Sequence, residues 1–182
     1  MNAEIIAIGS ELLTPHRSDT NSLFLTAQLN QLGVSVVYKT VVGDDRARLT
    51  ETIGLAWRRS EMVITIGGLG PTEDDLTREC ASEALGITLQ NDPAIASELE
   101  ARFRQRGIDM PRINLRQAMV LAGATVLPNA RGTAPGQLLR PLTIRQGCVL
   151  RATTVWRRNG QPRPEQMTRT DMPGFTPLSR SS

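Results

Sequence analysis

The sequence predicts an α/β domain of three layers, with helices on both faces of a mostly parallel sheet. Short runs of branched apolar residues alternate along the chain with segments of helical periodicity, the order that a doubly wound sheet requires. Apolar residues make up 40% of the chain and aromatic residues only 3%. The core must therefore be built from Leu, Ile, Val and Ala, which suits a parallel sheet covered by helices. At 182 residues, the chain has the length of one domain with a sizeable core.

Three apolar runs predict the strands of the first half of the chain. They lie at 3–9, 34–42 and 62–66 and are rich in Ile and Val. The second run is interrupted at 38–40, where Tyr, Lys and Thr follow one another. Helical segments separate the three runs, so we expect parallel strands.

Acidic residues mark the starts of the predicted helices, because a carboxylate accepts hydrogen bonds from the free N–H groups of a first helical turn. Pro93 suits the first position of the last of these helices. The candidate caps are Asp19, Asp45, Asp74 or Asp75, and Asp92. The corresponding helices are expected over 20–32, 46–60, 76–85 and 93–106.

The remaining predicted elements are shorter. The only histidine, His16, lies in a polar loop, and we expect it to be solvated. We expect a brief extended piece at 87–89, a short helix at 114–121, and strands at 125–127 and from 137 onward.

One stretch is a candidate ligand site. Residues 67–77, after the third strand, read GGLGPTEDDLT. Glycines without Cβ atoms would let an anion approach the backbone, and free N–H groups converge with the positive end of the following helix. The carboxylates at 73–75 favour, in addition, a divalent metal or a ribose or pterin donor group. A solvated turn with ordinary helix caps is the alternative interpretation.

The glycine spacing excludes two common phosphate motifs. The dinucleotide fingerprint requires G-x-G-x-x-G, and Glu73 stands where its last glycine would be. A Walker A loop requires G-K-[ST] at its end, and the stretch has no lysine. Asp44 also follows a predicted strand at the sheet edge where ligands bind in α/β domains, although helix capping is an equally good role for it.

Residues 67–77 resemble the signature G-G-[TL]-G-P-T-x-x-D-[VL]-T of molybdopterin-binding domains, which have the molybdenum-cofactor-biosynthesis fold. Three more motifs, in the same order, are similar to the amino-terminal domain of the CinA family of competence- and damage-inducible proteins. They are IGSELL followed by DTN at 8–13 and 19–21, VGDD at 42–45, and NARGTAPG at 129–136. The resemblance covers about 1–139 and implies a three-layer α/β/α domain that is often oligomeric.

The resemblance also implies a function. For the CinA branch, it implies hydrolysis of ADP-ribose or a related dinucleotide with a divalent metal (Mg²⁺, Mn²⁺ or Co²⁺). For the molybdopterin branch, it implies binding or adenylylation of a pterin phosphate. The residues expected to be catalytic are Asp75 and Asp44, and the expected metal ligands are Asp75 and Asp74. The expected substrate-binding residues are Gly67, Gly68, Gly70, Thr72, Glu11, Asn21, Gly132 and Thr133.

The resemblance stops where the composition changes. Residues 1–139 hold 13 Lys and Arg against 16 Asp and Glu, whereas 140–182 hold 8 Arg against 2 acids. We therefore predict one domain over 1–139, truncated at its carboxy-terminal end, and an aberrant or disordered tail rich in Arg, Pro and Thr over 140–182. The family's L-P-G-x-P loop is missing from this tail, so an inactive fragment is an alternative. Reading the coding DNA in its other frames tests this hypothesis, which fails if no such loop appears.

Composition bounds the remaining partners. The positive charge belongs to the predicted tail, so nucleic acid is an unlikely partner for the domain. Cys80 and Cys148 are too few for a disulfide framework or a zinc site. Met1 leads into the first strand without a signal peptide, and no apolar run approaches membrane-spanning length. We expect a cytoplasmic protein that binds a nucleotide or pterin phosphate and can form a homo-oligomer.

Overall fold

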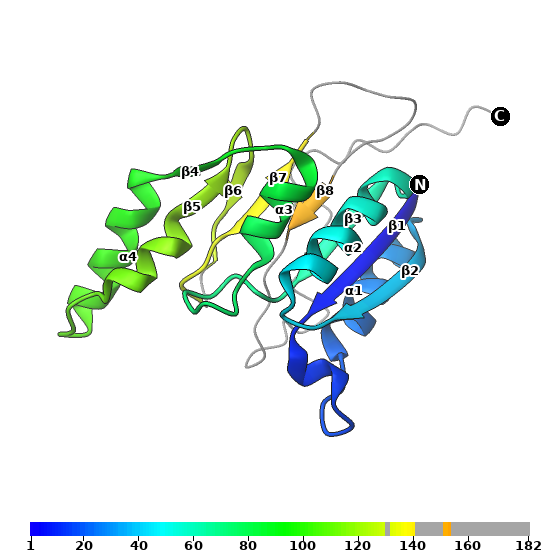
Figure 1. The fold of residues 1–182 in the computed structure, drawn as a ribbon, viewed down its shortest axis with the longest axis horizontal. Coiled ribbons are helices and arrows are strands. Elements are labelled where there is room, and N and C mark those ends of the chain that lie inside the picture. Colours follow the sequence, from blue (N-terminus) through cyan, green and yellow to red (C-terminus); the bar gives the residue numbers. More distant parts are fainter. Residues whose placement is uncertain (130–131, 141–150, 154–182) are drawn as a thin grey trace.

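The fold was obtained as a computed structural model that describes residues 1–129, 132–140 and 151–153, the last of these in backbone only (Figure 1). The strands are β1 (Asn2–Ile8), β2 (Ser35–Val42), β3 (Met62–Ile66), β4 (Leu89–Asn91), β5 (Met119–Leu121), β6 (Thr125–Leu127), β7 (Gly136–Leu139) and β8 (Arg151–Thr153). The α-helices are α1 (Thr20–Gln31), α2 (Arg46–Arg59), α3 (Thr77–Leu85) and α4 (Pro93–Gln105). Two 3-10 helices are η1 (Ser10–Leu13) and η2 (Arg112–Ala118).

The described strands form a six-stranded sheet in the order β2-β1-β3-β8-β7-β6. The first four run parallel, and β7 is antiparallel to both of its neighbours. In the register of the sheet, Ile5 lies beside Lys39 of β2 and Ile64 of β3. The carboxyl ends of β1, β2 and β3 therefore meet at one edge of the sheet. The predicted α/β fold with a mostly parallel sheet is confirmed.

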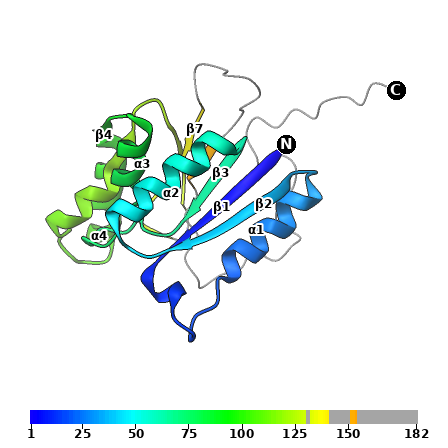
Figure 2. The ribbon, with the colours of Figure 1, turned by 45° about the vertical axis from the view of Figure 1, so that its right-hand side comes forward.

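The alternation of side chains along the strands builds two cores, one on each face of the sheet. Ile5 and Ile64 pack with Leu29 of α1 on one face. Ile6 packs with Leu49 of α2 on the other face, in a cluster that also includes residues of α3. Figure 2 shows α1 on one side of β1, β2 and β3 and α2 on the other. This arrangement is the predicted three-layer order.

A smaller lobe is built from α4, η2 and the two-stranded antiparallel sheet β4-β5. We call it the α4–η2 lobe. Ile95, Leu99, Ala118 and Val120 form its core. In Figure 1, α4 lies at the opposite end of the molecule from α1. The short helix predicted at 114–121 is present in part: the 3-10 helix η2 covers 114–118, but residues 119–121 form β5, which pairs with β4.

The second strand is continuous where an interruption was predicted. β2 runs from Ser35 to Val42 and pairs only with β1 among the described strands, although the register shifts by one residue at Val37, which has no partner in β1. It is an edge strand, and the ring of Tyr38 is about half exposed and lies 3.8 Å from the guanidinium carbon of Arg59. Polar side chains at 38–40 do not break the strand because solvent is available to them there.

Three of the four predicted helix caps are confirmed. Asp19, Asp45 and Asp92 each accept a hydrogen bond from a backbone N–H in the first turn of α1, α2 and α4, respectively. The fourth prediction is wrong: α3 begins after Leu76 and has no side-chain cap. The carboxylate of Asp75 bonds to Thr72 instead, inside the preceding loop.

Two further expectations concern the whole chain. No helix in the described ranges is long and apolar enough to cross a bilayer.

The predicted tail at 140–182 lies outside the described residues, apart from Arg140 and the strand β8. β8 pairs with both β3 and β7 and so joins the two parts of the sheet.

Candidate functional site

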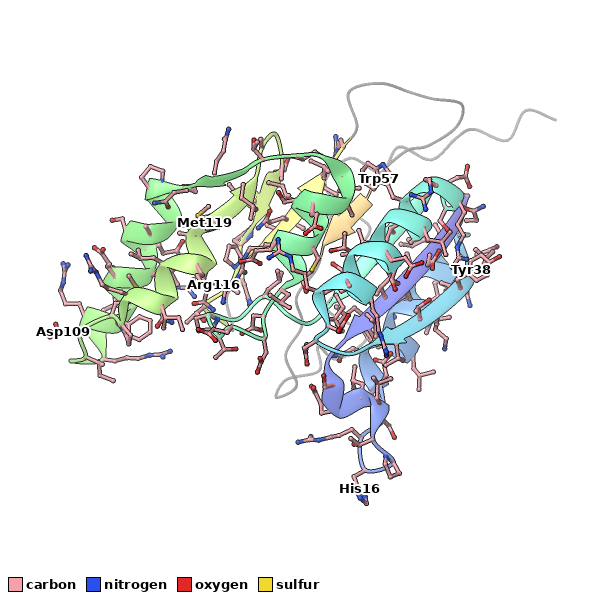
Figure 3. The ribbon with its side chains drawn as sticks, viewed as in Figure 1. His16, Tyr38, Trp57, Asp109, Arg116 and Met119 are labelled. Atoms are coloured by element: carbon pink, nitrogen blue, oxygen red, sulfur yellow. The ribbon has the colours of Figure 1, made fainter. Side chains whose placement is uncertain are left out.

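A cavity of about 480 Å³ lies at the carboxyl ends of β1 and β3, in the volume range of small-molecule sites. Loops after β1, β2 and β3 contribute its walls, as the parallel strands require. Nine of the eleven predicted site residues line it: Glu11, Asn21, Asp44, Gly67, Gly68, Gly70, Thr72, Asp74 and Asp75. The exposed His16, expected to be solvated, lies at the tip of the loop between η1 and α1 (Figure 3).

The glycine loop, residues 67–75, is held from behind by the start of α3. The Thr77 hydroxyl donates to the carbonyl oxygen of Gly67 at 2.8 Å. The Thr77 N–H donates to the carbonyl oxygen of Gly68 at 3.1 Å. One threonine therefore orients two consecutive peptide groups of the loop.

Arg78 orients the next two carbonyl groups. Its guanidinium donates to the carbonyl oxygens of Leu69 and Gly70, both at 2.8 Å. The side chain is 2% exposed, and burial lowers the pKa of its guanidinium, an effect that the nearby Glu79 carboxylate opposes. The Nε atom of Arg78 is buried without a hydrogen-bond partner among the described residues.

The N–H groups of this loop face the other way. In a trans peptide, a carbonyl and the N–H of the next residue point in opposite directions. With the carbonyls of residues 67–69 turned toward α3, the N–H groups of Gly68, Leu69 and Gly70 turn away from it, on the side where these residues line the cavity. Among the described residues, none accepts a hydrogen bond from these three N–H groups. Successive outward N–H groups form a concave anion-binding surface.

The glycines are needed for a different reason from the one the sequence suggested. Gly67 and Gly68 have φ values of +103° and +64°, which side chains rarely tolerate. A Cβ at Gly67 would collide with the Ile8 carbonyl, and one at Gly68 with the Thr77 hydroxyl. A Cβ at Gly70 would collide with the Asp75 carboxylate. The missing side chains therefore make room for the protein's own atoms, and it is the orientation of the N–H groups that leaves the backbone open to an anion.

The two predicted catalytic carboxylates are fixed by hydrogen bonds at the cavity wall. Asp75, which is 9% exposed, accepts at Oδ2 from the Thr72 N–H at 3.0 Å and the Thr72 hydroxyl at 2.5 Å. Asp44 accepts at Oδ2 from the Ser10 N–H at 2.8 Å, and its own N–H donates to the Ser10 hydroxyl at 3.0 Å. Both carboxylates line the same cavity although 31 positions separate them in the sequence.

The acidic donor set of the cavity fits a hard divalent cation. Within the described ranges, no three His, Cys, Asp or Glu side chains form a ready metal cluster. Mg²⁺, however, is usually held by one or two carboxylates together with substrate phosphates and waters. Asp75 and the adjacent Asp74 are a pair of that kind on the cavity wall. Their roles as metal ligands stay predictions.

The cavity wall is strongly acidic. Its carboxylates are those of Glu11, Asp19, Asp44, Asp74 and Asp75. Arg17 is the one cationic side chain among the described lining residues. An unaccompanied phosphate would meet repulsion from these carboxylates, which a bound cation would relieve.

Gly132 and Thr133, also predicted to bind substrate, do not line this cavity. The Gly132 N–H donates to the Asn129 side chain at 2.9 Å, and its carbonyl accepts from Arg102 at 2.7 Å. The Thr133 hydroxyl accepts from the Gln117 side chain at 3.0 Å. These residues belong to a second turn rich in Gly and Pro, at 128–136, which borders a separate depression of about 210 Å³ beside α4. The substrate-binding role of both residues stays a prediction.

Sequence reasoning missed three arginines at the site. Arg17 borders the cavity, Arg78 holds the glycine loop, and Arg116 contacts the same loop from η2. Arg78 directly follows the motif threonine, so its place in the motif was a usable signal. Arg116 lies 41 positions beyond Asp75, and no local pattern indicates that contact.

Comparison with known proteins identifies the family. The profile of the probable molybdopterin-binding domain matches residues 4–168. The chain therefore belongs to this family of molybdopterin-binding domains.

Curated relatives narrow this assignment to the CinA branch, so the predicted resemblance is confirmed. The chain is 55% identical over 139 residues to a CinA-like protein of Koribacter versatilis, a match that covers 76% of this chain and 34% of that protein. It is 43% identical over 172 residues to a CinA-like protein of Deinococcus deserti, covering 92% of this chain and 43% of that protein. The chain thus spans less than half of the length of these relatives.

Solved structures agree with the family. The structure of the protein CinA from Thermoplasma acidophilum, of unknown function, has a TM-score of 0.73 at 28% identity. The match covers 85% of this chain and 87% of that one. A molybdopterin biosynthesis protein from Mycobacterium abscessus has a TM-score of 0.51 at 18% identity over 86% of this chain and 82% of that one. This second likeness shows the fold alone.

Proposed function

We propose that this domain hydrolyses the pyrophosphate bond of ADP-ribose, or of a related dinucleotide, with the help of a divalent metal. One observation carries the proposal: the outward N–H groups of Gly68, Leu69 and Gly70 and the carboxylates of Asp44 and Asp75 border one cavity. Such a site offers donors for phosphate oxygens beside acids that can bind a metal and handle protons. The similarity to CinA-like proteins supports the CinA branch of the predicted activities.

The loop N–H groups bind and orient the substrate in this proposal. They are fixed before the substrate arrives, because Thr77 and Arg78 hold the loop carbonyls. Fixed donors cost no reorganisation when negative charge develops on the phosphate oxygens. Asp44 accepts a proton of the attacking water at a carboxylate oxygen, while the Asp75 carboxylate is kept for the metal. The water oxygen bonds to one phosphorus of the bridge, the bridging P–O bond at that phosphorus breaks, and AMP and ribose 5-phosphate are released.

A divalent metal would be held by Asp75 with Asp74 nearby. When bound, it would neutralise phosphate charge and lower the pKa of a coordinated water. The acidity of the cavity supports this requirement, since a metal–nucleotide complex is a better ligand for five carboxylates than a free anion.

A second candidate is a module that binds a molybdopterin-like pterin phosphate or adenylylates it. The description of the matching family profile favours it. The same N–H groups would hold the pterin phosphate. Retention of a pterin through purification, without any cleavage of ADP-ribose, would select this candidate.

The deciding experiment is a cleavage assay on the purified 182-residue chain. ADP-ribose is incubated with Mg²⁺, Mn²⁺ or Co²⁺, or with EDTA, and AMP is quantified by chromatography. We expect AMP release with at least one of these metals and none with EDTA. Absence of AMP with every metal, from a protein that unfolds cooperatively, would overturn the proposed activity. Absence of a cooperative transition would instead support the predicted inactive fragment.

A further inference from the structure

We infer that Arg116 is a positioning residue that fixes the glycine loop from the α4–η2 lobe and so sets how tightly the site holds its substrate. The inference rests on the proposed function, since the loop in question is the proposed phosphate site. It assigns a task in ligand binding to a lobe that contributes no lining residue to the cavity among those described.

The contacts of Arg116 converge on the half of the loop that carries the candidate metal ligands. One terminal nitrogen of its guanidinium donates to the Pro71 carbonyl at 3.4 Å and to the Thr72 carbonyl. The other donates to the Asp75 carbonyl at 3.2 Å. One planar side chain thus spans three carbonyls of the loop, which a flexible ammonium could not do with the same geometry.

The position of Arg116 is itself fixed from both sides. Its guanidinium pairs with the Glu79 carboxylate of α3 at 2.8 Å, and both side chains are about three-quarters buried. Gln117, next to Arg116 in η2, is 2% exposed, and Ala118 belongs to the lobe core with Leu99 of α4. Figure 3 labels Arg116 between the α4–η2 lobe and α3. A shift of this lobe would therefore carry the guanidinium with it.

The arginines divide the loop between them. Arg78 holds residues 69 and 70, and Arg116 holds 71, 72 and 75. The Arg116 contacts fix the turn in which Thr72 bonds to the Asp75 carboxylate. Loss of Arg116 would free that turn without adding or removing any group that touches the substrate. The expected consequence is mainly weaker binding of the substrate and of the metal that this turn would hold, since every reacting group is kept.

A variant set separates positioning from mere support of the fold. Arg116→Met removes the donors but keeps an unbranched apolar stem, and Arg116→Lys keeps the charge without the fork. Arg112→Met is the matched control, because Arg112 lies in the same 3-10 helix, carries the same charge and is exposed. Hydrogen–deuterium exchange is measured without ligand at the amides of Thr72 and Asp75, which are hydrogen-bonded within the turn. KM and kcat are measured for ADP-ribose with the most active metal.

We expect Arg116→Met to speed exchange at Thr72 and Asp75 relative to β1 and β3, to raise KM about tenfold and to change kcat much less. Arg116→Lys should fall between it and the parent chain, and Arg112→Met should match the parent chain. Unchanged exchange at Thr72 and Asp75 would overturn the inference. Faster exchange with an unchanged KM would also overturn it, because the contact would then support the fold only. If the parent chain cleaves nothing, the proposed function fails, and the exchange result alone decides whether Arg116 fixes the loop.

Discussion

Two turns of this chain are rich in Gly and Pro and were predicted to bind substrate, yet the structure treats them differently. In the glycine loop, the donors of α3 occupy the carbonyls and leave the N–H groups of residues 68–70 on the cavity side. In the second turn, at 128–136, the Gly132 N–H is consumed by the Asn129 side chain within the turn. Composition alone therefore does not predict which turn leaves N–H groups open to a ligand; the hydrogen-bond partners of the carbonyl and N–H groups decide it.

The two turns also differ in the side chains that surround them. Acidic side chains line the cavity of the glycine loop. Two of them come from different loops: Asp44 follows β2, and Asp75 lies between β3 and α3. The second turn is held by Arg102 and Gln117 of the α4–η2 lobe. The first arrangement leaves donors for a ligand, whereas the second uses its polar groups to join the lobe to the sheet.

The largest expected effect comes from Asp75. Asp75→Asn keeps the shape and the acceptor that Thr72 needs but removes the charge, so cleavage of ADP-ribose should fall by about a hundredfold or more. Glu73→Gln is the control, because Glu73 is a neighbouring acid that does not line the cavity. The ratio of kcat/KM between the variants is the measurement. Turnover of Asp75→Asn at the level of the parent chain would remove Asp75 from the mechanism.

A smaller effect is expected from the loop backbone, for which Gly68 in the glycine loop and Gly86, the C-cap of α3, provide a matched pair. Gly68 and Gly86 have φ values of +64° and +65°, so alanine costs each about 1 kcal/mol of unfolding free energy. A Cβ at Gly68 also collides with Thr77, whereas nothing lies within 4 Å at Gly86. Gly68→Ala should raise KM for ADP-ribose about tenfold, and Gly86→Ala should change only the melting temperature. Equal KM values in the two variants would contradict the assigned role of the loop.

A substitution in the second turn should lower the stability of the fold without weakening the binding of ADP-ribose. Thr133→Val removes the acceptor of the Gln117 amide, which should lower the free energy of unfolding by about 1 kcal/mol. The KM for ADP-ribose should stay close to that of the parent chain. Urea denaturation and steady-state kinetics provide the two numbers. If Thr133→Val raised the KM for ADP-ribose as much as Gly68→Ala, the second turn would contribute to substrate binding, and the proposed difference between the two turns would be wrong.

The smallest expected effect is on the reactivity of the Cys80 thiol, which tests how α3 packs beneath the glycine loop. Burial raises the pKa of the Cys80 thiol above its ordinary value of 9.0. The folded state therefore holds this proton more tightly than the unfolded state, and the associated stability is lost as the pH rises through the raised pKa. In a Cys148→Ser background, alkylation near pH 8.5 should be slower in the native than in the urea-unfolded protein. Equal rates would show that α3 is not packed as described.

Local patterns were sufficient for much of the fold. The runs of Ile and Val in β1 and β3 and the caps Asp19, Asp45 and Asp92 predicted these elements because each depends on neighbours in the sequence. The cap of α3 was mispredicted because the Asp75 carboxylate has a better partner in Thr72. The continuity of β2 depends on its place at the edge of the sheet, which the sequence of the strand does not record.

The site was predictable only where its residues belong to one motif or follow a parallel strand. Residues 67–75 are contiguous, and Asp44 joins them because the carboxyl ends of parallel strands share an edge. The second turn could not be placed, because its partners Gln117 and Arg102 lie 16 and 30 positions away from it. Arg116, 44 positions beyond Thr72, is undetectable from the sequence for the same reason.

An NMR titration of the ¹⁵N-labelled chain tests the proposed phosphate site most directly. AMP with Mg²⁺ supplies a phosphate that hydrolysis of a pyrophosphate bond cannot consume. The amide signals of Gly68, Leu69 and Gly70 should shift most, and that of Gly132 should stay in place. Signals of residues 68–70 that do not move at saturating AMP and Mg²⁺, or a larger shift at Gly132, would contradict the account.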